Sequence, residues 1–106
     1  MASEAELSKI IEEETLKFKG VSRFADPGLA DNITKAVRPR DFVHPSIKIA
    51  EDEGEYTINL EILVHYGVNI PQLCYDIQTG LIHSMMERAG IVVKTVNIRV
   101  EGIDEA

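Results

Sequence analysis

The sequence predicts an α+β fold, a small sheet of three or four strands with two helices packed on one face, in the order helix, strand, strand, helix, strand. Three observations support this prediction. Two segments carry apolar residues at helical spacing, residues 47–64 alternate like two strands around a turn, and residues 91–100 alternate again after the second helix. The 106 residues fit one domain, 1–106, whose best-supported part is 47–103.

The first helix is expected from about Glu4 to Phe18. Ser3 followed three residues later by Glu6 is a capping-box pattern at its start, and Gly20 is the expected stop. Four apolar residues fall on one face of this helix: Leu7, Ile10, Ile11 and Phe18. The acidic run 12–14 lies opposite that face, so we expect it to be solvated.

A loop-rich connector is expected between residues 21 and 46. Residues 26–28 form a turn sequence, and two further prolines, Pro39 and Pro45, interrupt regular structure. A short helical turn fits residues 30–37. The connector also holds a basic group that allows anion binding, although solvent exposure is the favoured interpretation: Lys35, Arg38 and Arg40.

A hairpin is expected next. Ile47 and Ile49 alternate with polar or small neighbours, and residues 51–55 supply a turn centred on Gly54. The second strand then alternates strictly over five apolar positions: Tyr56, Ile58, Leu60, Ile62 and Val64. Its opposite face is mostly polar and is expected to meet water or a polar partner: Thr57, Asn59, Glu61, Leu63 and His65.

The second helix is expected from about Ile70 to Ala89. Asn69 is a good N-cap residue, Pro71 suits the first turn, and Gly90 fits the position after the last turn. One apolar stripe should lie against the sheet: Ile70, Leu73, Cys74, Ile77, Leu81 and Met85.

A second apolar set on this helix widens the arc beyond what one sheet face covers. Tyr75, Ile82 and Met86 are separated by seven and four residues, so they share a face. Two interpretations are open. Either the first helix packs against these side chains, or they form an interaction surface for a second copy of the chain or for another protein.

A third strand is expected from about Ile91 to Val100. Alternation places one set of residues on the apolar face: Val92, Val96, Ile98 and Val100. It places another set on the opposite face: Val93, Thr95, Asn97 and Arg99. Lys94 interrupts the apolar face, so we expect it near a sheet edge where its ammonium group reaches solvent.

Charge and composition limit the partners. The formal net charge of −7 arises in the second half, because residues 1–50 carry eight basic and eight acidic side chains whereas residues 51–106 carry three and ten. Such a surface repels nucleic acid and anionic lipid, so neither nucleic-acid binding nor direct membrane insertion is expected. A single cysteine and an N-terminus without a signal-peptide pattern predict a cytoplasmic protein, reaching a membrane only through a partner.

The residues show no pattern for catalysis, and neither a metal nor a cofactor site is expected. The three histidines, His44, His65 and His83, lack metal-ligand spacing, and Cys74 is best interpreted as a structural thiol. No phosphate-binding loop, nucleophile elbow or zinc pattern is present. The alternative left open is a small-molecule or ion site on the polar sheet face, made by Asn59, Glu61, His65, Asn97 and Arg99.

Two motifs carry a resemblance to a known family. Residues 66–71 read Tyr-Gly-Val-Asn-Ile-Pro before the long helix, and residues 96–102 read Val-Asn-Ile-Arg-Val-Glu-Gly in the last strand. Together, over about residues 47–103, they resemble the alkaline shock protein family of bacteria. The resemblance implies a cytoplasmic domain without known catalysis, linked to envelope or alkaline stress, which in some bacteria gathers at the membrane through a membrane-anchored partner.

Three functional hypotheses follow. The first is a non-enzymatic protein-interaction domain that uses the surface of Tyr75, Ile82 and Met86 or an exposed strand edge. It binds a protein partner or forms a homo-oligomer. The second is the small-molecule or ion site on the polar sheet face. The third, an RNA-binding domain, is suggested only by the helix-and-sheet arrangement and is opposed by the acidic second half.

Overall fold

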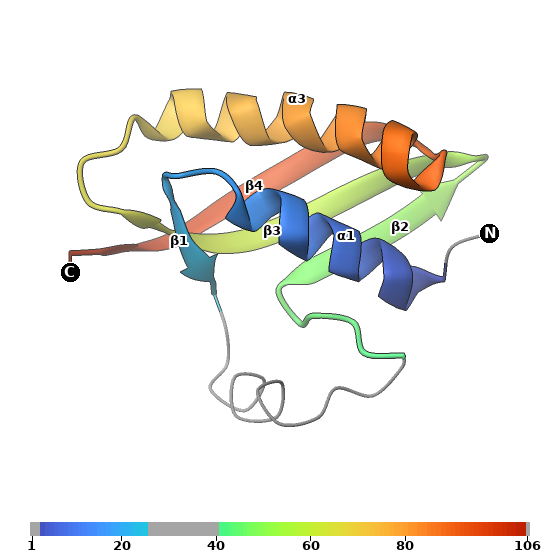
Figure 1. Ribbon diagram of the computed structural model, residues 1–106, viewed down its shortest axis with the longest axis horizontal. Helices are drawn as coiled ribbons and strands as arrows, with labels where there is room; N and C mark the ends of the chain where they lie inside the picture. The colour runs from blue at the N-terminus through green and yellow to red at the C-terminus, as the bar shows by residue number, and fades with distance from the viewer. Residues whose placement is uncertain (1–2, 26–40, 106) are drawn as a thin grey trace.

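The computed structural model describes residues 3–25 and 41–105 and shows an α+β fold, as the sequence predicts. In chain order, the elements are α1 (Glu4–Leu16), β1 (Val21–Phe24), β2 (Ile47–Asp52), β3 (Glu55–His65), α3 (Ile70–Ala89) and β4 (Val92–Asp104). Both helices lie over the same face of the sheet (Figure 1). The expected helical turn at 30–37 and the basic group of Lys35, Arg38 and Arg40 lie outside the described residues.

The sheet is built around β3. β1 and β2 both pair antiparallel with β3, β1 near its C-terminal end and β2 near its N-terminal end, while β4 pairs parallel with it along its whole length. The parallel pair is joined by α3, because parallel neighbours need a long crossover connection. The sheet is therefore mixed, and β4 forms one of its edges over the described part of the chain.

The hairpin between β2 and β3 confirms the predicted turn. Asp52 pairs with Glu55, so only two residues make the connection, and both have positive φ: Glu53 at 53° and Gly54 at 83°. Two positive φ values are the geometry that matches the twist of the flanking strands.

The prediction of a connector beginning at residue 21 is wrong for its first four residues, which form β1. Val21 and Phe24 are both buried in the core, but they are three residues apart and do not alternate. The register against β3 shifts between Val21 and Arg23, which leaves Ser22 as the extra residue of a bulge. The bulge turns both apolar side chains to the same face. Because they no longer alternate with polar residues, the sequence pattern does not indicate a strand here.

The predicted faces of the last strand are wrong at its start. Val93 is only 5% exposed and lies in the core, whereas Val92 is 46% exposed. Val93 pairs with Tyr56 and Thr95 with Thr57, so Lys94 is an unpaired extra residue. This bulge reverses the alternation and lets the exposed Lys94 leave the apolar face, on the edge strand where the sequence placed it.

The helix ends follow the predicted capping residues. The Ser3 hydroxyl accepts a hydrogen bond from the Glu6 amide in a complete capping box, Asn69 caps α3, and Gly90 closes it in the left-handed conformation at φ 68°. α1 ends at Leu16, two residues before the expected Phe18.

The end of α1 approaches α3 closely. A Cβ atom at Gly80 would lie 2.8 Å from Cζ of the Phe18 ring, so any larger residue at this position would force the ring to shift.

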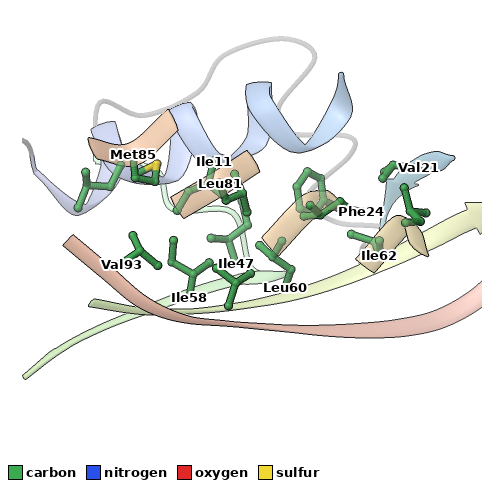
Figure 2. Close-up of a cluster of buried hydrophobic side chains, with 14 of the residues drawn as sticks. Ile11, Val21, Phe24, Ile47, Ile58, Leu60, Ile62, Leu81, Met85 and Val93 are labelled. Atoms are coloured by element: carbon green, nitrogen blue, oxygen red, sulfur yellow. The ribbon is translucent and has the colours of Figure 1, made fainter. Parts of the chain in front are cut away.

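The core lies between the helices and one face of the sheet (Figure 2). α3 contributes the predicted stripe, of which Leu73, Ile77, Leu81 and Met85 are buried. The alternate positions of β3 are almost fully buried beneath them: Ile58, Leu60, Ile62 and Val64. Each such aliphatic side chain stabilises the fold by about 1.5–3 kcal/mol.

A polar cluster joins α1 to α3 at the rim of this core. The Glu14 carboxylate accepts hydrogen bonds from Ser84 Oγ at 3.0 Å and from Arg88 Nη1 at 2.8 Å, and Arg88 Nη2 donates to Glu13 at 2.9 Å. Lys17 Nζ also donates to Glu14, at 2.9 Å. The expectation of a wholly solvated acidic run at 12–14 is therefore wrong at Glu14, whose side chain is 14% exposed.

The cluster predicts a pH-dependent contribution to stability. The hydrogen bond from Lys17 lowers the pKa of the Glu14 carboxyl below its usual value, with further help from Ser84 and Arg88, although desolvation opposes the shift. A lowered carboxyl pKa stabilises the fold above the unfolded-state pKa and loses that effect as pH falls through the folded-state pKa. We expect Glu14→Gln to lower the free energy of unfolding at pH 7 and to differ little from wild type near pH 3. Urea titrations across this range measure it; an equal difference at both pH values would contradict the role of the charge.

A second prediction concerns a buried hydroxyl in α1. Thr15 is fully buried, and its Oγ1 has no hydrogen-bond partner among the described residues. An unsatisfied buried hydroxyl costs about 1–3 kcal/mol, and valine matches threonine in shape and helix propensity. We expect Thr15→Val to raise the free energy of unfolding by about 1 kcal/mol, measured by urea denaturation.

The matched control is Ser8→Ala, also on the buried side of α1. Ser8 Oγ accepts a hydrogen bond from the His44 amide at 3.1 Å, so its removal should lower stability by about 1 kcal/mol. A loss of stability in Thr15→Val as well would show that the threonine hydroxyl is satisfied.

Candidate functional site

The predicted apolar surface on α3 is exposed. Tyr75 is 61% exposed, Ile82 40% and Met86 48%. α1 packs on a different flank of α3, through Gly80, Ser84 and Arg88, so the interpretation in which the first helix covers these side chains is wrong. In Figure 1, α3 lies along the upper edge of the molecule with α1 to one side of it.

Thr79 makes this surface continuous. It lies between Tyr75 and Ile82 on the same face, and its hydroxyl donates to the backbone oxygens of Tyr75 at 3.1 Å and Asp76 at 3.2 Å. Because the helix backbone satisfies the hydroxyl, the methyl group extends the apolar surface. We call the row of Tyr75, Thr79, Ile82 and Met86 the outer stripe of α3; the sequence prediction missed Thr79 because its residue type is polar.

One flank of the outer stripe is acidic. Asp76, His83 and Glu87 recur at spacings of seven and four residues, so they share the flank that faces α1. Glu87 and His83 form a pair at the surface, and Asp76 accepts a hydrogen bond from Gln72 at 2.9 Å. The opposite flank carries Gln78, whose amide donates to the Val96 carbonyl of β4 at 2.9 Å.

The polar sheet face brings together four of the five residues predicted for it. Asn97 donates to Asn59 at 3.0 Å, and Arg99 lies 3.9 Å from Glu61. These side chains line a shallow open hollow of about 250 Å³. Arg99 also pairs with Glu101 at 2.8 Å, a residue that the sequence prediction missed.

Glu101 was missed because the strand expected from the sequence ends at Val100, whereas β4 continues to Asp104 with a second bulge in this part. Val100 pairs with Ile62 and Gly102 with Leu63, which leaves Glu101 as the extra residue. Continuing the alternation of Asn97 and Arg99 by one step would have assigned Glu101 to the polar face.

His65, the fifth predicted residue, belongs to a different cluster at the end of β3. It pairs across the sheet with Asp104, whose carboxylate accepts hydrogen bonds from Ser22 Oγ and from Arg23 Nε. The Ser22 hydrogen bond lowers the pKa of Asp104, assisted by the charges of Arg23 and His65. The cluster ties β1 to β4 across the end of the central strand.

The His44 imidazole and the Cys74 thiol both lie at least partly inside the fold. His44 is buried beside Phe24, and its Nδ1 accepts a hydrogen bond from the Ser46 amide at 3.1 Å. Cys74 is half-buried, and desolvation raises the pKa of its thiol. No group of three or more potential metal ligands is found within residues 3–25 and 41–105. In the same ranges, neither helix combines the length and the apolar character needed to span a membrane.

Comparison with known proteins gives one family. Residues 2–105 match the alkaline shock protein 23 family, which is described as having a cell envelope-related function. The chain is 25% identical over 75 residues to the uncharacterized protein YloU of Bacillus subtilis strain 168, covering 71% of this chain and 62% of that protein. It is 27% identical over 89 residues to the uncharacterized protein Spy1535 of Streptococcus pyogenes serotype M6, covering 84% and 66%.

The chain thus spans a little under two thirds of the length of these curated relatives. No solved structure matches it.

The surroundings of Cys74 predict an unreactive thiol. Because the thiolate is the nucleophile, a raised pKa slows alkylation at neutral pH. We expect iodoacetamide to modify Cys74 more slowly at pH 7 than it modifies a cysteine in an unstructured peptide, measured by mass spectrometry over time. The chain unfolded in urea is the control and should react at the peptide rate. A folded-state rate above the peptide rate would indicate an activated cysteine.

Proposed function

Since this chain belongs to the alkaline shock protein 23 family, whose function is cell envelope-related, we propose that it is a non-enzymatic domain that binds another polypeptide through the outer stripe of α3. The observation that carries the proposal is the exposure of Tyr75, Ile82 and Met86 on a 20-residue helix whose opposite stripe is buried. Contiguous exposed apolar side chains of this kind mark interaction sites.

The core supplies the rigidity that an interface needs. Leu73, Ile77, Leu81 and Met85 hold α3 against the sheet along its length, so the outer stripe is presented in one arrangement. Little conformational entropy is then lost when a partner binds. The family's envelope-related function makes a membrane-anchored envelope protein the expected partner. We expect this chain to bind that partner on the cytoplasmic side.

The polar sheet face is the second candidate. The hollow lined by Asn59, Glu61, Asn97 and Arg99 favours it as a small-molecule or ion site. However, Asn59 pairs with Asn97, and Arg99 pairs with Glu61 and Glu101. A ligand would have to compete with these pairs, whereas the apolar side chains Tyr75, Ile82 and Met86 of the outer stripe are exposed.

A photocrosslinking experiment tests the proposal. Tyr75 is replaced by p-benzoylphenylalanine, which keeps an aromatic ring at the position, and the protein is irradiated in the cells that produce it. We expect a covalent adduct with another polypeptide chain that disappears in an Ile82→Asp or Met86→Asp background, because a buried carboxylate opposes apolar contact. Far-ultraviolet circular dichroism should stay unchanged, since both side chains are exposed.

The matched control is Asn97→Asp on the polar sheet face, which should leave the adduct in place. The absence of an adduct at Tyr75, or an adduct that persists in both stripe variants, would contradict the proposal.

A further inference from the structure

We propose that the occupant of the outer stripe is an amphipathic helix of another protein whose apolar side is bordered by lysine or arginine. This inference rests on the proposed function and specifies the chemistry of the partner. It follows from the acidic flank, from the position of Arg88, and from the amount of apolar surface on the stripe.

The acidic flank runs parallel to the stripe. Asp76 and Glu87 lie three turns apart, and the one group between them that can carry positive charge is His83, which faces Glu87. The Glu87 side chain is 64% exposed. A helix packed on the outer stripe would therefore place the residues at its own border next to two carboxylates.

The cations nearest in sequence are already engaged. Arg88 is the only lysine or arginine between residues 49 and 93, and it is turned toward α1, where it pairs with Glu13 and Glu14. Lys17 of α1 also pairs with Glu14. The flank thus keeps its negative charge, and a complementary partner must bring the positive one.

A second copy of this chain fits poorly. In a symmetric dimer with antiparallel α3 helices the acidic flank meets itself, so Asp76 and Glu87 would face identical carboxylates, within a chain of net charge −7. Pairing through the β4 edge is also opposed, because both bulges of that strand carry a charged residue, Lys94 and Glu101. Bulges and charges on an edge strand prevent edge-to-edge association.

The size of the stripe requires such electrostatic help. Tyr75, Ile82 and Met86 are 61%, 40% and 48% exposed, so a partner covers only about half of three apolar side chains. Burial on that scale falls short of the free energy that even a millimolar complex requires. Charge pairs along the flank are the source of additional affinity and of selectivity between partners.

Two synthetic helical peptides test the inference. They share one apolar side and differ only in its border, which is lysine in one and glutamate in the other. We expect the lysine-bordered peptide to bind at least about fivefold more tightly, with an advantage that shrinks as salt is raised. Ile82→Asp should weaken its binding at least about tenfold. Fluorescence anisotropy of labelled peptides measures both effects.

A charge-reversed variant separates local pairing from general attraction. Asp76→Lys combined with Glu87→Lys changes the net charge from −7 to −3 and should reverse the peptide preference. Glu51→Lys combined with Glu105→Lys makes the same change away from the stripe, at two exposed positions, and should keep the original preference. Circular dichroism checks that all variants fold. If the double lysine variant of the flank does not fold, the combination of Asp76→Asn and Glu87→Gln is used in its place.

Several outcomes would overturn the inference. These are equal binding of both peptides, no binding of the lysine-bordered peptide, or the same response in the flank variant and its control. Sedimentation showing a dimer that Ile82→Asp dissociates would identify a second copy as the occupant instead. A retained Tyr75 adduct together with any of these results would leave the proposed function standing, whereas loss of the adduct would reject both.

Discussion

The structure depends on the burial of one face of the central strand. Ile58, Leu60, Ile62 and Val64 of β3 are at most 1% exposed, and β3 is the strand with which β1, β2 and β4 all pair. Both helices are positioned by covering this face (Figure 2). Because alternation has a period of two, a one-residue slip in β3 would expose all four side chains and bury the polar face.

The same constraint assigns the remaining surfaces. On the face of β3 and β4 that points away from the helices, Asn97 donates a hydrogen bond to Asn59 and Arg99 pairs with Glu61. α3 is held against the sheet by its buried residues Leu73, Ile77, Leu81 and Met85. The outer stripe is therefore not needed for the core and is available for binding. A helix with two apolar stripes, one buried and one exposed, is the physical basis of the proposed function.

The sheet contains three bulges over the described residues, and two of them account for differences between sequence expectation and structure. Ser22 in β1, Lys94 in β4 and Glu101 in β4 are each extra residues in the pairing with β3. A bulge changes which side chains face the core, and it can be recognised only when the register against the paired strand is known. Alternation within a single segment therefore missed β1 and exchanged Val92 with Val93. The Glu101 pair was missed for another reason, because the expected strand ended at Val100 whereas β4 continues to Asp104.

Local patterns in the sequence were enough to predict the α+β class, the hairpin, both helices with their caps, and the family resemblance, because capping, periodicity and turn residues act over a few neighbouring positions. The sequence also identified Tyr75, Ile82 and Met86 as apolar residues beyond those one sheet face requires. Only the tertiary structure decided that α1 packs beside this stripe through Gly80 and leaves it exposed. It likewise placed His65 apart from the other four polar-face residues and turned Arg88 toward α1, since contacts between distant segments depend on packing and register, which local patterns do not contain.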